Sequence, residues 1–221
     1  MATGVPERHV QIAIGPALLS GDLRVPSCAP AVVAFAHGSG SSRLSPRNRF
    51  VADALVRHGL ATLLIDLLTL AEESADLETA ALRFDIPLLA DRLGGVTDWL
   101  RDEPQTRAMA VGYFGASTGA AAALVAAADR PRTVGAIVSR GGRPDLARPV
   151  LNRIRQPSLL IVGGADELVL DMNNTALVEL AGPKHLAIVP GATHLFEEPG
   201  ALDQVASLAS DWFQRYLVDR G

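Results

Sequence analysis

Short runs of almost wholly apolar residues recur along the chain, and longer stretches with helical periodicity separate them. A strand that is apolar at nearly every position is typical of a parallel sheet, because helices cover both of its faces. Such runs in alternation with helices predict β-α-β units. From residue 31 onward, the runs lie at residues 31–36, 61–65, 108–114, 134–138, 159–162 and 186–189. We therefore expect a single α/β domain over residues 1–221, with a mostly parallel central sheet and helices on both faces.

The remaining segments predict an opening pair of strands and several helices. Residues 10–15 and 17–25 indicate two strands joined by a tight turn. Ser45 followed by Pro46 is typical of a helix N-terminus, because serine caps the first turn and proline fits its first position. The acidic stretch at residues 67–82 lacks strand character, and we expect a loop with a helical piece there. Apolar residues at steps of three and four predict further helices at residues 88–100, 118–128 and 202–216.

Composition excludes several classes of function. The formal net charge of −4 argues against a nucleic-acid partner, which usually needs a basic face. Cys28 is the lone cysteine, so no intrachain disulfide is possible. Residues 1–11 carry charges where a signal peptide needs an apolar run, and no stretch matches a membrane span. We expect a cytoplasmic protein with neither a nucleic-acid nor a membrane partner.

The pentapeptide GASTG, residues 115–119, follows one apolar run and directly precedes a helical stretch. This G-x-S-x-G pattern is typical of a nucleophile elbow, a sharp turn from strand to helix. The strained backbone at the serine leaves room only for very small residues two positions away on either side. The turn exposes the hydroxyl at a helix N-terminus, which favours developing negative charge. We predict that Ser117 is a nucleophile; the alternative is a glycine-rich turn with an incidental serine.

A histidine with the expected position follows the last apolar run. A serine hydroxyl is a poor nucleophile unless a base removes its proton, and the usual base is a histidine oriented by a carboxylate. Where the serine lies on an elbow of this kind, the acid and then the histidine follow it along the chain. His194 meets this requirement, whereas His185 lies at the start of a predicted strand and the other three histidines precede the serine. We predict that His194 is the general base.

The acid has one favoured candidate and several rivals. Asp166 lies just beyond the run at residues 159–162, on a loop of small residues. Glu167 and Asp171 follow closely, and Asp145 lies after the preceding strand, from which the acid can also be supplied. We predict that Asp166 orients His194, and Asp145 is the reserve candidate.

The loop after the run at residues 31–36 reads HGSGSS. Acyl transfer develops a negative oxygen that two backbone N–H groups can bind. Thr118, directly after the nucleophile, is expected to supply one of them. We assign the second to Ser39, with Gly38 or Gly40 as alternatives. The small side chains of this loop would permit the close approach of its backbone to a substrate.

The same glycines do not predict a nucleotide cofactor. The loop lacks the lysine and spacing of a phosphate-binding P-loop. A dinucleotide fingerprint needs a third glycine at position 43, where this chain has Arg43. The histidines are scattered and form no ligand cluster in the sequence, so no metal site is predicted. We expect a chemistry that requires no cofactor.

Together these motifs resemble the α/β-hydrolase superfamily and, within it, the dienelactone-hydrolase-like group of small enzymes without a large cap. The resemblance covers almost the whole chain, from about residue 10 to residue 217. It rests on the segments HGSG (37–40), GASTG (115–119), GAD (164–166) and GATH (191–194). Dienelactone hydrolase itself has a cysteine nucleophile, whereas this chain has Ser117. The resemblance therefore does not imply a dienelactone substrate, and serine is typical of ester, lactone or thioester cleavage.

We expect hydrolysis of a small acyl substrate through an acyl-enzyme at Ser117. The segment at residues 139–156 is too short for a lid domain, which favours an open site. Arg140 and Arg143 lie where ligands bind in open α/β sheets and could bind a carboxylate or phosphate of the substrate. The alternative is that these and neighbouring arginines are surface groups that pair with the acidic residues 72–78. Two other functions stay open: acyl transfer by the same residues, and a non-catalytic binding protein on the same scaffold.

Overall fold

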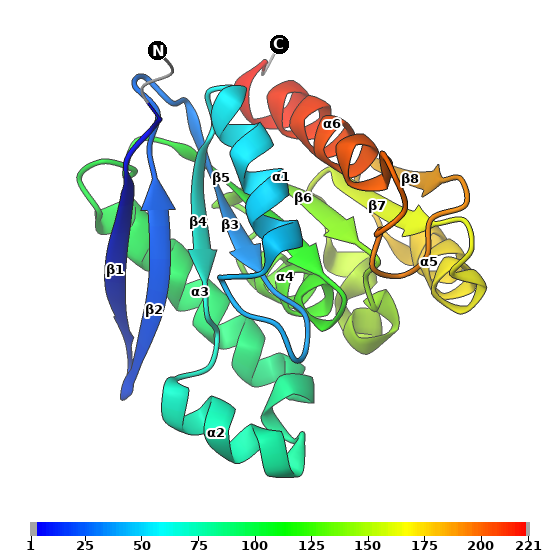
Figure 1. The fold of residues 1–221 in the computed structure, drawn as a ribbon, viewed down its shortest axis with the longest axis horizontal. Helices are drawn as coiled ribbons and strands as arrows, with labels where there is room; N and C mark the ends of the chain where they lie inside the picture. Colours follow the sequence, from blue (N-terminus) through cyan, green and yellow to red (C-terminus); the bar gives the residue numbers. More distant parts are fainter. Residues whose placement is uncertain (1–3, 220–221) are drawn as a thin grey trace.

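The computed structural model describes residues 4–219, and eight strands form one sheet there (Figure 1). The strand order is β1-β2-β4-β3-β5-β6-β7-β8. The pairs β1–β2 and β2–β4 are antiparallel, and every later neighbouring pair is parallel. The strands are β1 (Glu7–Ile14), β2 (Ala17–Arg24), β3 (Ala31–Ala36), β4 (Ala61–Ile65), β5 (Ala110–Ala116), β6 (Val134–Arg140), β7 (Ser158–Gly163) and β8 (Lys184–Val189).

Helices cover both faces of the sheet (Figure 1). The helices are α1 (Pro46–Arg57), α2 (Leu70–Thr79), α3 (Ile86–Asp102), α4 (Thr118–Asp129), α5 (Glu167–Glu179) and α6 (Ala201–Phe213). Helices α1 and α6 pack on one face, whereas α3, α4 and α5 pack on the other. Because both faces are covered, β3 and β4 are buried at every position, and their sequences show no alternation. The shorter helical segments are η1 (Leu82–Phe84), η2 (Pro144–Arg153) and η3 (Gln214–Val218).

Side-chain caps set the start of the two helices that follow β3 and β4. Ser45 accepts a hydrogen bond from the backbone N–H of Asn48 at 3.4 Å, and Pro46 occupies the first turn of α1. At α2, Thr69 and Glu72 form a capping box in which each side chain accepts the backbone N–H of the other. Helix α2 is therefore fixed at its N-terminus, beside the edge of the sheet where β4 ends.

The predicted α/β architecture with a mostly parallel sheet and no large cap is confirmed. The opening hairpin and the strands after it lie where the sequence predicts them, although β5 continues to Ala116, directly beside the elbow serine. Helix α5 and the 3₁₀ segment η2 were not predicted. Across residues 4–219, no helix combines the length and the apolar composition that crossing a bilayer requires.

Candidate active site

Ser117 lies at the junction of β5 and α4 with φ 51° and ψ −120°, a strained backbone for any residue with a side chain. The two flanking glycines leave no room for a Cβ atom. A Cβ on Gly115 would lie 2.4 Å from the Cα of Ala120, and one on Gly119 would lie 2.3 Å from the carbonyl oxygen of Ala36. Because the neighbouring atoms belong to the backbone, no side-chain movement relieves either contact. The G-x-S-x-G spacing is thus a packing requirement of this turn.

His194 and Asp166 are brought together by the loops that follow β8 and β7. The His194 Nδ1 lies 2.7 Å from the Asp166 Oδ2, so these two predicted residues form a hydrogen bond. An ionised carboxylate only accepts hydrogen bonds, and we therefore assign the proton to Nδ1. The lone pair of the imidazole is then on Nε2. The Asp166 side chain is 15% exposed and that of His194 is 40% exposed, so the base can be reached from solvent.

The segment between β6 and η2 contacts both the elbow and the histidine. The Ser117 N–H donates to the carbonyl of Arg140 at 3.2 Å, and the Arg143 N–H donates to the carbonyl of Ser117 at 3.1 Å. Between them, a Cβ on Gly141 would lie 3.4 Å from the His194 Cε1. No hydrogen bond joins the Ser117 hydroxyl to His194 within residues 4–219. Such bonds often tighten only in the substrate complex.

The two predicted oxyanion donors lie side by side. The Ser39 N–H donates to the Thr118 hydroxyl at 2.9 Å, which joins the loop after β3 to the start of α4. The Thr118 N–H is in the first turn of α4, where a helix offers it no internal acceptor. Gly38 packs on the elbow, and a Cβ there would lie 3.0 Å from the Ser117 Cβ. Stabilisation of an oxyanion by Ser39 requires that its bond to Thr118 be exchanged for one to the substrate.

Arg140 and Arg143 have different surroundings. The Arg143 guanidinium forms a bidentate pair with Asp145, with both contacts at 2.8 Å, and this pair lowers the pKa of Asp145. Arg140 is 8% exposed and lies over the ring of Phe196, with its Cζ 5.8 Å from the ring centroid. Its Nε and Nη1 are buried without a hydrogen-bond partner in the described part of the chain, and burial lowers its pKa to about 10.

The arginines after β3 pair with carboxylates outside the acidic residues 72–78. The pairs are Arg43 with Asp66 and Asp22, Arg47 with Glu197, and Arg49 with Glu7 and Asp22. The alternative drawn from the sequence, in which these arginines pair with the acidic stretch, is therefore wrong for all three. Their role is to tie the loop after β3 and the start of α1 to the neighbouring strands and loops.

A cavity of about 600 Å³ opens beside the elbow, on the side of the predicted oxyanion loop. Ser39 and Thr118, the two predicted oxyanion donors, line it, whereas Ser117 and His194 do not. Its wall is largely aliphatic, as the low aromatic content predicts. The leucines that line it are Leu44, Leu67, Leu68, Leu70, Leu77 and Leu89. The space suits a small or modest apolar group beside Ser39 and Thr118.

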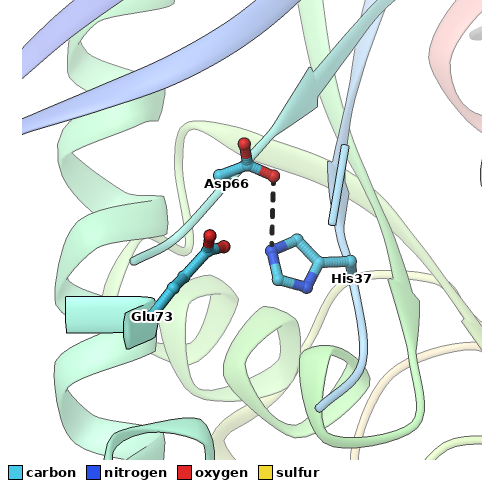
Figure 2. A group of neighbouring side chains, drawn as sticks. All are labelled: His37, Asp66 and Glu73. Atoms are coloured by element: carbon cyan, nitrogen blue, oxygen red, sulfur yellow. Dashed lines mark ion pairs between the residues drawn. The ribbon is translucent and has the colours of Figure 1, made fainter. Parts of the chain in front are cut away.

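Three groups that could bind a metal ion meet beside this cavity, and two of them, His37 and Glu73, line it (Figure 2). His37 follows β3, Asp66 follows β4 and Glu73 lies on α2. One ligand atom of each lies within 4.8 Å of the others, and the His37 Nε2 is 3.8 Å from an oxygen of Asp66. The sequence predicted no metal site, because these residues are far apart in the chain. Parallel neighbours β3 and β4 end at the same edge of the sheet and bring the group together.

The sheet order and the elbow define the α/β-hydrolase fold, and comparisons with known proteins assign the family. The model of the dienelactone hydrolase family matches residues 19–218. A crystal structure of dienelactone hydrolase from Anabaena variabilis is 60% identical, with a TM-score of 0.94 and coverage of 96% of this chain and 98% of that one. The chain therefore belongs to the dienelactone hydrolase family.

The chain is also similar to one curated protein in sequence and to a second solved structure in fold. A Mycobacterium tuberculosis (strain H37Rv) protein named "Putative phosphoribosyl transferase" is 55% identical over 215 residues, which are 97% of this chain and 48% of that protein. The chain thus spans about half the length of this curated relative. A Xanthomonas campestris "a/b serine hydrolase without lid" shares the fold, with 20% identity, a TM-score of 0.75 and coverage of 97% of both chains.

Proposed function

We propose that this chain is a serine hydrolase that cleaves an ester, lactone or thioester of a small substrate through an acyl-enzyme. The observation that carries the proposal is the 2.7 Å hydrogen bond between His194 and Asp166, on loops at the same sheet edge as the strained elbow of Ser117. A general base held by a buried carboxylate is what a serine nucleophile requires. The family of the chain, whose members include hydrolases, supports the same reaction class.

Each step of the reaction assigns one role to a residue of this site. The Ser117 hydroxyl attacks the substrate carbonyl while the His194 Nε2 takes its proton. Asp166 keeps the Nδ1–H in place and stabilises the imidazolium that forms. The Thr118 N–H and the start of the α4 dipole stabilise the oxyanion, together with the Ser39 N–H once it leaves the Thr118 hydroxyl. The imidazolium then protonates the leaving oxygen or sulfur, and water, deprotonated by the same histidine, releases the acid.

The name of the Mycobacterium tuberculosis relatives indicates a different reaction, phosphoribosyl transfer. This chain corresponds to 48% of those proteins, so their name can describe the part that it does not match. The site at Ser117 offers a hydroxyl nucleophile and oxyanion donors, which suit an acyl carbonyl. We therefore propose acyl chemistry for this chain, with acyl transfer and a non-catalytic role as outcomes of the test below.

A fluorophosphonate probe tests the nucleophile. We expect the probe to label the wild type and the matched variant Ser41→Ala, whose hydroxyl lines the neighbouring cavity, but not Ser117→Ala. The wild type is then assayed on a panel of esters, lactones and thioesters, with and without an added alcohol acceptor. Free acid as the main product supports hydrolysis, and a new ester formed from the acceptor indicates acyl transfer. No labelling of folded wild type contradicts the proposal and favours the non-catalytic role.

Recognition of an anionic substrate by Arg140 and Arg143 stays a prediction. Arg140 offers two buried donor atoms without a partner, which supports the idea, whereas Arg143 is already bound by Asp145. If Arg140 binds a substrate carboxylate, Arg140→Gln raises KM for a hemisuccinate ester but not for its neutral methyl analogue. Equal losses on both esters contradict the prediction.

A further inference from the structure

Three hydrogen-bond acceptors, on His37, Asp66 and Glu73, lie close to one another, and His37 and Glu73 also line the cavity beside the elbow (Figure 2). The His37 Nδ1 lies 3.0 Å from the carbonyl oxygen of Gly38, which only accepts, so Nδ1 carries the proton. Burial lowers the pKa of His37, so the ring is neutral and its Nε2 presents a lone pair. That Nε2 is buried and has no hydrogen-bond partner among the described residues. It lies 3.8 Å from the Oδ1 of Asp66, and Glu73, on α2, is the third residue of the group.

The group contains one carboxylate, Glu73, without an ion-pair partner among residues 4–219, and the charge of Arg43 only partly opposes the rise in its pKa. Asp66 is neutralised by Arg43, whose backbone N–H and guanidinium donate to its two oxygens at 2.6 and 2.5 Å. Glu73, by contrast, has no ion-pair partner within residues 4–219, and burial together with Asp66 raises its pKa. The other charged side chains that line the cavity are paired: Arg47 with Glu197, and Arg83 with Asp76. A cation that donates hydrogen bonds would satisfy both the acceptors and the charge.

The spacing of the acceptors can be compared with the spacing around an ammonium group and around a metal ion. Around a protonated amine, three acceptors at about 2.9 Å along tetrahedral N–H directions lie about 4.7 Å from one another. A transition metal with ligand bonds of about 2.0–2.2 Å brings its ligand atoms to about 3.0–3.5 Å. In this cluster the atoms lie within 4.8 Å of one another, and the pair formed by His37 and Asp66 is 3.8 Å apart. The 3.8 Å between His37 and Asp66 lies between these two spacings and nearer to that of a metal, so the distances admit either cation. An alkylammonium is the cation whose carbon chain the adjoining leucine-lined cavity also accommodates.

We propose that His37, Asp66 and Glu73 form a subsite for a primary ammonium group of the substrate. The inference rests on the proposed hydrolase function and names its substrate class, an aliphatic ester or lactone with a protonated amine several carbons from the scissile carbonyl. The leucines of the cavity bind the carbon chain, and the three acceptors bind the three N–H groups at its end. Glu73 supplies the charge selectivity, because it is the carboxylate of the group that forms no ion pair with an arginine in the described residues.

Matched ester pairs test the subsite. Methyl 6-aminohexanoate is compared with methyl heptanoate, and 4-aminobutyl acetate with pentyl acetate, so that an ammonium replaces a methyl group in either half of the substrate. We expect the ratio of kcat/KM, ammonium over neutral, to fall at least about tenfold in Glu73→Gln for one of the two pairs, because one charge-assisted interaction is lost. The matched control is Glu78→Gln, which removes the same charge from an exposed position of the same helix and should leave both ratios unchanged. Unchanged ratios in Glu73→Gln overturn the proposal.

A binding experiment separates this subsite from the catalytic proposal. Pentylammonium chloride is titrated into Ser117→Ala protein and followed by ligand-observed NMR, and we expect saturable binding that the additional change Glu73→Gln removes. If pentylammonium binds but the wild type hydrolyses no ester, the subsite is supported and the proposed function is refuted. Equilibrium dialysis against Zn²⁺ and Mn²⁺, followed by metal analysis, tests whether the three residues bind a metal ion instead. Stoichiometric metal retained by wild type and lost in Glu73→Gln overturns the ammonium assignment.

Discussion

Replacing Asp166 by asparagine tests the proposed proton relay at one hydrogen bond. In the native protein, the Asp166 Oδ2 accepts the Nδ1–H of His194 at 2.7 Å. Asparagine has the same shape, but its amide can turn an N–H toward the ring and donate to Nδ1. The imidazole proton then moves to Nε2, the atom that must take the proton of Ser117. The variant thus keeps the geometry of the site and presents the wrong tautomer to the nucleophile.

The size of the effect follows from what the substitution removes. It withdraws a carboxylate that faces the imidazolium of the transition state at hydrogen-bond distance, and it stabilises the inactive tautomer of the ground state. Together these are expected to lower kcat roughly 10³- to 10⁴-fold, or about 4 to 5.5 kcal/mol in activation free energy. Asp166 is absent from the cavity lining, so KM should change by less than about threefold.

The assay measures kcat and KM on 4-nitrophenyl acetate, with the thermal midpoint as a check of folding. The matched control is Asp145→Asn, the same chemical change at the rival acid, which Arg143 already holds. We expect Asp145→Asn to retain activity within about threefold of wild type. Loss of activity in Asp145→Asn with Asp166→Asn near wild type would reverse the assignment. Wild-type activity in both variants would refute the relay altogether.

Two further predictions concern stability. Gly119→Ala should lower the free energy of unfolding in urea by about 3 kcal/mol or prevent folding, because its Cβ would lie 2.3 Å from the backbone oxygen of Ala36. Gly4→Ala, where a Cβ meets nothing within 4 Å, should be neutral, and equal stability of the two variants would contradict this packing argument. The hydrogen bond from Arg92 lowers the pKa of Glu72 to about 2 from its usual 4.5, so this pair stabilises the fold above pH 4.5 and loses its effect as the pH falls toward 2. The thermal midpoint of Glu72→Gln should therefore vary less than that of wild type over this window, and parallel curves would show that the pair adds nothing.

The elbow could be predicted from the sequence because its physical constraint is local. Gly115 and Gly119 have backbone atoms of the same turn, or of the adjoining strand, where a Cβ would lie, so the constraint appears as a short motif. The buried strands β3 and β4 could also be predicted, because helices on both faces of the sheet make these strands apolar at nearly every position. Helix α5 was missed because its buried residues are few, whereas Leu168 and Val178 are strongly exposed. Apolar residues out of phase with the buried face leave no clear helical stripe.

The order of residues in the sequence does not identify which carboxylate at the sheet edge pairs with the histidine. Asp66, Asp145 and Asp166 all follow parallel strands, β4, β6 and β7, and thus reach the same edge. Asp66 precedes the serine in the chain, but Asp145 and Asp166 both follow it, so position alone leaves two candidates to orient the histidine. The structure separates them by their bonds: Arg43 holds Asp66, Arg143 holds Asp145, and His194 is bound to Asp166.

Arg143 and Asp145 lie two residues apart, whereas Arg43 follows β3 and pairs with Asp66 after β4, so this second pairing depends on how neighbouring loops pack and leaves no motif. The same packing creates the acceptor group at His37, because Arg43 forms its ion pair with Asp66 and Glu73 has none among the described residues. Asp66 lies directly after a buried strand, the same signal that identifies Asp166. A search for polar residues at every strand end would therefore have found His37 and Asp66, although not Glu73, which lies on α2.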